Sequence, residues 1–359
     1  MYRLGGSAGQ LQAALNGARE AKTLHHFETP DQTSINPSNW RSQLGGCGLY
    51  GVGVDLKYPA WYSFFSERVA QQGRLSTFQE FAPPLFNGLA GDFLHAVIEL
   101  SYWLESGSES DELLISGLAW SAAAYQELPR PATPIASPVD PVTALQALAQ
   151  DPHQFPVFDV NDGSSGYIHA LEEMAEVPAH REALLRHDLH TPVAGDEALL
   201  QRVCEAACLS FMSSSPPCVD FYLLHLVTGS RAVWTLLTQG DWTGADRDKL
   251  WEDALGTLWR TTLWTHASRN RPQLPPEPED VASLRSWEDI FAWALASDNS
   301  HAMKVVVTCA DFHARWGSPC FWHAADLMMT GVSERLKTEG TSSFVGMGAG
   351  SFLAHYTGE

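Results

Sequence analysis

The chain has 359 residues, of which 45% are hydrophobic and 11% aromatic, so it is long enough to bury a large core. Its formal net charge of −20 repels nucleic-acid phosphates and anionic membrane surfaces, and we expect no nucleic-acid partner. The N-terminus lacks the apolar stretch of a signal peptide, and no later segment approaches the ~18 apolar residues of a membrane span.

Apolar residues recur with the 3.6-residue period of helices along most of the chain, whereas strand-like alternation is scarce. Stretches rich in proline and glycine at 129–141, 161–166 and 271–280 are interpreted as connections between helical layers. The pattern predicts an all-α fold, a large multi-helix single domain over residues 1–359, with helices at 8–22, 59–90, 92–106, 111–127, 196–212, 219–238, 247–267, 281–297, 301–316 and 319–336.

The six cysteines follow no disulfide-framework spacing. A reduced thiol in an apolar helix acts as a small hydrophobic side chain. We therefore expect a reducing compartment, the cytoplasm, because four of the cysteines lie in apolar helical stretches: Cys204, Cys208, Cys309 and Cys320.

The segment 92–106 is apolar nearly all the way round, which is typical of a helix buried on every side. Asp92 is the expected N-cap of this helix, and the region of Gly107 is its expected end. His95 and Glu99 stand four residues apart and therefore share one stripe of the helix.

Single histidines interrupt other apolar helices in the same way. His225 lies among leucine, valine and phenylalanine residues of 219–238. In 301–316, His301 and Lys304 are three residues apart and face the same side of the predicted helix. His323 in 319–336 is followed three residues later by Asp326.

A single histidine in an apolar helix is usually a core residue whose ring nitrogens find private hydrogen-bond partners. Burying a polar ring without partners costs ~1–3 kcal/mol, so several isolated cases favour a shared ion or ligand. The second interpretation predicts a buried metal site built from His95, His225 and His301 between helices.

Lys304 bears on this choice, because a buried ammonium either pairs with a carboxylate or loses its charge. A neutral lysine amine reacts with carbon dioxide to give a carbamate, an anionic oxygen ligand that would complete a histidine-rich metal sphere. The alternative is an ordinary salt bridge, and the candidate partners for it are Asp298, Asp311 and Glu99.

Three blocks in this order resemble the questin oxidase-like family, and the resemblance extends over most of the chain. They are LFNGLAGDFLHAVIELSYWLESGS with the following LLISGLAWSAAAY, then VDFYLLHLVTGSRAV, and then NSHAMKVVVTCADFHARWGSPCFWHAADLM. The resemblance implies an oxygenase that opens anthraquinone-type polyketide rings in a Baeyer–Villiger-like step. It also implies a non-haem iron site with His95, His225 and His301 as ligands and Lys304 as a carbamylated lysine.

The resemblance departs at the front of the chain. The family pattern has a histidine-bearing helix just upstream of a segment like LYRLGAS, whereas this chain begins at MYRLGGS. We therefore expect that Met1 is an internal methionine and that a further histidine ligand lies upstream. His25 and His26 are the candidate substitutes within the chain, although their flanks have the composition of a loop.

The first functional hypothesis is thus an Fe(II)-dependent oxygenase whose partners are dioxygen and a small aromatic substrate. Tyr102, Trp103 and Trp322 are candidate lining residues, and Glu99 is a catalytic candidate that orients a ligand histidine. NADPH is the candidate external reductant, although the sequence offers no site for it. The alternative is a helical protein that binds a hydrophobic ligand and performs no chemistry.

Overall fold

The helical prediction can be compared with a computed structural model of the protein. It describes residues 7–9, 34–45, 54–132, 139–153, 155–159, 163–189, 195–214, 219–242, 247–280, 285–297 and 299–339. Within these ranges the regular secondary structure is helical apart from one isolated bridge between Leu89 and Gln126, which confirms the all-α prediction. No helix in the described ranges has the length and apolarity needed to cross a membrane.

In the first half of the chain, the described residues form short 3-10 helices and six α-helices. The 3-10 helices are η2 (Trp40–Gln43), η3 (Phe86–Gly88) and η4 (Gly91–Leu94). The α-helices are α2 (Val54–Gln72), α3 (Arg74–Leu85), α4 (His95–Glu105), α5 (Asp111–Ala123), α6 (Pro141–Gln150) and α7 (Gly163–Glu176).

Further α-helices follow in the described residues. They are α8 (Pro178–Leu185), α9 (Glu197–Met212), α10 (Phe221–Gln239), α11 (Arg247–Ser268), α12 (Trp287–Ala296), α13 (Ser300–Trp316) and α14 (Pro319–Glu339). Two of them, α10 and α13, carry His225 and His301. Side-chain caps begin several of them, since Asp220 accepts from the backbone of α10 and Asn299 accepts from that of α13.

Two features of the predicted helix pattern were wrong. The apolar run 59–90 is not one helix, because Gly73 adopts a left-handed φ of 83° and separates α2 from α3. Helices α6, α7 and α8 were not predicted, and the glycine-rich stretch 161–166, interpreted as a connection, includes the first residues of α7. The predicted helix at 8–22 falls almost entirely outside the described residues.

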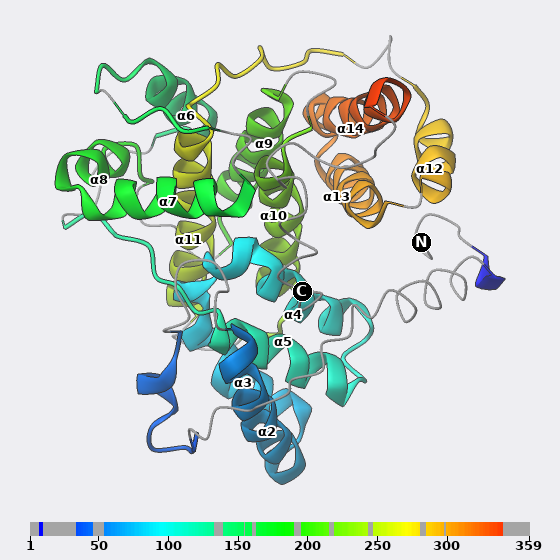
Figure 1. The fold of residues 1–359 in the computed structure, drawn as a ribbon. Helices are drawn as coiled ribbons and strands as arrows, with labels where there is room; N and C mark the ends of the chain where they lie inside the picture. The colour runs from blue at the N-terminus through cyan, green and yellow to red at the C-terminus, as the bar shows by residue number, and fades with distance from the viewer. Residues whose placement is uncertain are drawn as a thin grey trace.

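Helix α10 is the centre of the molecule (Figure 1). It packs against α4, α9, α11 and α13, and nearly all of its residues are buried. Helices α2 and α3 lie on the side of α4 and α5 that faces away from α10. Helices α12, α13 and α14 pack together at the other end of the molecule. Because α4 and α13 both pack on α10, side chains from these three helices, which are distant in sequence, can meet beside α10.

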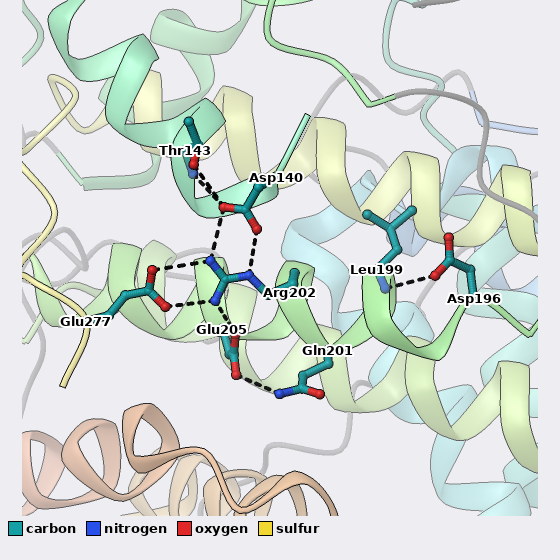
Figure 2. Close-up of polar contacts among 8 residues, drawn as sticks. All are labelled: Asp140, Thr143, Asp196, Leu199, Gln201, Arg202, Glu205 and Glu277. Atoms are coloured by element: carbon teal, nitrogen blue, oxygen red, sulfur yellow. Dashed lines mark hydrogen bonds and ion pairs between the residues drawn. The ribbon is translucent and has the colours of Figure 1, made fainter. Parts of the chain in front are cut away.

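A cluster of charged side chains around Arg202 joins three parts of the fold (Figure 2). Its guanidinium on α9 donates to Asp140 at the start of α6 and to Glu277 in the segment 271–280 between α11 and α12. It also donates to Glu205, a buried carboxylate that accepts a further hydrogen bond from Gln201. The arginine therefore neutralises a buried charge and connects the long proline-rich segment to the helices.

We expect Arg202→Met to lower the free energy of unfolding by about 1.5–3 kcal/mol, the range for hydrogen bonds to charged groups. The loss arises because Glu205 stays buried and charged without its cation. The matched control is Arg315→Met, which removes a pair with Glu197 in which both side chains are more than 40% exposed. Urea denaturation measures both, and equal losses for the two variants would contradict this interpretation.

Candidate metal centre

Three helices bring His95, His225 and His301 together. His95 is the first residue of α4, His225 lies in the second turn of α10, and His301 lies in the first turn of α13. The ring centroids of His95 and His225 are 4.4 Å apart, and those of His225 and His301 are 5.2 Å apart. One ligand nitrogen from each ring lies within 4.8 Å of the other two. The predicted clustering of these histidines is confirmed.

The position of His95 depends on an unusual turn just before it. Asp92, Phe93 and Leu94 all have left-handed backbone conformations, with φ values of 47°, 54° and 67°. Non-glycine residues lose roughly 1–2 kcal/mol each in this region, so the surrounding structure must hold the turn in place. The turn directs the carbonyl of Asp92 at Nδ1 of His95, 2.7 Å away.

Side chains and close backbone contacts supply that support. The Asp92 carboxylate accepts a 2.8 Å hydrogen bond from Nε1 of Trp120, so Asp92 is not the N-cap that was predicted. The Phe93 ring packs against two tyrosine rings, and Leu94 packs against Gly229, where α10 has no Cβ. The helix begins three residues later than expected because these buried contacts outweigh local helix propensity.

Gly91 allows the turn to approach α5, since a Cβ at this position would lie 1.6 Å from the Ala124 carbonyl oxygen. We expect Gly91→Ala to cost about 1–3 kcal/mol of unfolding free energy, because a backbone oxygen cannot rotate away as a side chain can. The shift should also displace the Asp92 carbonyl and weaken metal binding through His95. Thermal unfolding and metal affinity test this, and an unchanged melting temperature would contradict it.

Backbone carbonyls also orient the second histidine. Nδ1 of His225 lies 2.6 Å from the carbonyl oxygen of Phe221, one turn earlier in α10. A carbonyl oxygen only accepts, so Nδ1 of both His95 and His225 carries the proton, and Nε2 is the lone-pair atom in the neutral ring. This is the arrangement in which a histidine offers Nε2 to a metal ion while its other nitrogen is held in place.

All three rings favour the neutral form. Burial lowers the pKa of His225 well below its usual value, and the neighbouring His95 and His301 lower it further. Burial and then the charge of Lys304 lower the pKa of His301 to about 3. The pKa of His95 is lowered mainly by burial, which outweighs the attraction of Asp92. Neutral imidazoles are the form that binds metal ions, so the site needs no deprotonation.

Lys304 lies one helical turn after His301 on α13, and its charge lowers the pKa of all three rings. Burial lowers its own pKa, and the carboxylate of Glu99 partly offsets this effect. Burial raises the pKa of Glu99, which accepts a 3.2 Å hydrogen bond from Ser116. Tyr58 in turn donates to Ser116 over 3.1 Å. Lys304 and Glu99 therefore influence each other electrostatically, and burial disfavours the charged form of each.

The other predicted partners lie elsewhere. Asp311 pairs with Arg231 rather than with Lys304, and Asp298 lies outside the described residues, as do His25 and His26. His323 meets the carbonyl of Asp280 through Nε2, and the structure does not bring it to the cluster. Of the predicted lining aromatics, Tyr102 borders a cavity near Lys304, whereas Trp103 packs on Phe78 and Trp322 on Trp287.

Two residues of the site were missed from the sequence. The indole of Trp120 stacks parallel to the His95 ring with centroids 6.1 Å apart, and it also holds Asp92. Phe221 supplies the carbonyl for His225, and its ring lies 5.3 Å from that of His301. Neither carries a chemical signal in the sequence, because one acts by packing and the other through its backbone.

The donor set fits a transition-metal ion. Three neutral imidazoles suit iron, zinc, copper or nickel, and nitrogen ligands bind at about 2.1 Å. Ligand atoms around such an ion lie about 3.0–3.4 Å apart, and the nitrogens of the three histidines lie within 4.8 Å of one another, so they would move closer together to bind one ion. The residues present are therefore compatible with a bound metal, with Lys304 as the adjacent side chain.

Comparisons with known proteins identify a family for this chain. No curated protein matches the chain significantly. The family model described as questin oxidase-like matches residues 1–309, which include all three histidines and Lys304. Because the match covers most of the chain in one continuous stretch, this protein belongs to the questin oxidase-like family.

Proposed function

We propose that this protein is a non-haem, iron-dependent oxygenase that opens a ring of an aromatic, anthraquinone-like polyketide substrate in a Baeyer–Villiger-like step. The observation that carries the proposal is the meeting of three histidines that favour the neutral form beside a half-buried lysine. Membership of a family named for an oxidase supports the reaction class.

His95, His225 and His301 would hold ferrous iron through Nε2, or the corresponding nitrogen of His301, and leave positions for dioxygen and substrate. The iron would supply the dioxygen chemistry that amino-acid side chains lack. The protein's own contribution is to keep the three rings neutral and aligned. The carbonyls of Asp92 and Phe221 perform this alignment for two of them, the role first assigned to Glu99.

The charge of Lys304 argues for carbamylation. An ammonium beside the histidines would repel a bound cation, since two unit charges about 4 Å apart interact by about 4 kcal/mol at an effective dielectric constant of about 20 and a divalent ion doubles this. If its neutral Nζ attacks the carbon of carbon dioxide, an N–C bond forms and one N–H proton leaves. The product is an anionic carbamate whose oxygen would serve as a ligand.

Glu99 would act on Lys304 as a positioning residue. Its carboxylate attracts the lysine, and its raised pKa lets it accept the proton that carbamylation releases. Ser116 and Tyr58 complete the hydrogen-bonded chain that holds it. Glu99→Gln should therefore reduce carbamylation of Lys304 rather than displace the histidines.

Insertion of one oxygen atom beside a ring carbonyl, with the other reduced to water, consumes two electrons from an external reductant. NADPH is our candidate for it. The test supplies iron-loaded protein with a dihydroxyanthraquinone, NADPH and oxygen-18 gas, and follows the products by mass spectrometry. We expect a ring-opened product that carries one labelled atom. Tight binding of the quinone without turnover would contradict the proposal and favour a helical protein that only binds a hydrophobic ligand.

A further inference from the structure

A cavity of ≈ 370 Å³ adjoins the histidine cluster and is not part of it. One face of α4 and one face of α13 form its walls, and α10 forms its floor. It arises because both wall helices pack on α10. Its volume falls in the range of about 300–1,000 Å³ that is usual for small-molecule sites. We refer to this cavity as the Lys304 groove.

The walls of the Lys304 groove are mostly apolar. Ile98 and Tyr102 contribute from α4, and Met303 and Val307 contribute from α13. Lys304 also borders the groove and lies one helical turn after His301 on α13, so this end of the groove is next to the cluster. A ligand in the groove would therefore reach the candidate metal centre at Lys304.

The buried guanidinium on the floor of the groove is already paired. Arg231 donates to both oxygens of Glu105 over 2.6 and 3.0 Å and to Asp311 over 2.8 Å. Two carboxylates thus more than balance a single buried guanidinium, and an anionic ligand group would meet net repulsion at this end of the groove.

We infer that the Lys304 groove binds the substrate as an uncharged, flat aromatic molecule whose reacting carbonyl lies at Lys304 and whose body lies between Tyr102 and Val307. This inference rests on the proposed function and adds a charge requirement and an orientation to it. It makes Val307 a specificity-determining residue, because its side chain borders the groove three residues beyond Lys304.

The test compares binding of a neutral dihydroxyanthraquinone with binding of the same ring bearing a carboxylate, measured by quenching of tryptophan fluorescence. We expect the neutral compound to bind at least tenfold more tightly. Val307→Trp should weaken its binding at least tenfold, because the indole fills the groove. Ala314→Trp, an exposed position on the same helix, should leave binding unchanged. Thermal unfolding confirms that both variants fold.

The inference is overturned if the carboxylate binds as tightly as the neutral compound, or if Val307→Trp binds like the unmodified protein. Metal content, measured on the same samples, separates this outcome from failure of the oxygenase proposal. If quinone binding depends on Val307 but the protein cannot hold iron, the substrate site in the groove is supported and the oxygenase proposal is contradicted. If the protein binds iron but its quinone binding does not depend on Val307, only the substrate site in the groove is overturned.

Discussion

His225→Ala should abolish stoichiometric iron binding and, with it, oxygenase activity. His225 is the central ligand of the proposed site, since its ring lies between those of His95 and His301. Loss of residues that only support a ligand weakens metal binding about 10–100-fold, so loss of the ligand itself should weaken it about 100-fold or more. Iron content after anaerobic loading and desalting, with oxygen uptake in parallel, measures both effects.

The control for this variant is His266→Ala. His266 is also a fully buried histidine on a long helix, and burial lowers its pKa to about 3. Its Nδ1, however, is hydrogen-bonded to the hydroxyl of Ser210, 2.7 Å away, and His266 is not part of the histidine cluster. Both variants should lose stability to a similar extent, but only His225→Ala should lose iron. Equal iron contents in the two variants would contradict the assignment.

Substitutions of Lys304 should distinguish the effect of its charge on iron binding from the effect of its side-chain length. Lys304→Met removes the amine and so prevents the carbamate, and we expect weaker iron binding and a loss of activity of about 100-fold. Lys304→Arg should bind iron still more weakly, because a guanidinium stays charged beside the three histidines. The order of iron affinity, unmodified protein above Met above Arg, is the expected result.

Carbon-13 labelling checks the carbamate directly. Protein equilibrated with labelled bicarbonate should show a carbamate resonance that both Lys304 variants lack, and Glu99→Gln should diminish it. A Lys304→Met variant that keeps full iron content and full activity would show that the lysine is only a structural neighbour of the site.

Much of this site followed from residue type and spacing. Burying a polar ring in an apolar helix costs free energy, and this identified three candidate residues: His95, His225 and His301. The helical period placed Lys304 beside His301 and Glu99 beside His95. The family resemblance then assigned them roles. Spacing alone could not show whether Lys304 forms a salt bridge with Asp311. Asp311 pairs instead with Arg231, which lies on another helix.

What sequence reasoning missed is backbone geometry and packing. The left-handed turn at 92–94 contains no glycine, so nothing local predicts it, and it forms because Gly91 and Gly229 let distant helices approach. The same limit applies to α6, α7 and α8, which start at proline or glycine residues, and the starts of α6 and α7 lie in stretches that were interpreted as connections. The groove beside Lys304 depends on how α4 and α13 sit on α10, a relation that no single helix encodes.

Anaerobic titration of the purified chain with ferrous iron tests most directly whether the histidine cluster holds a metal ion. Spectroscopy of the nitric oxide adduct reports on the nitrogen ligands in the same sample. We expect one tightly bound iron per chain with histidine nitrogens coordinated to it. A well-folded chain that binds no more iron than His225→Ala would show that the cluster is not a metal site.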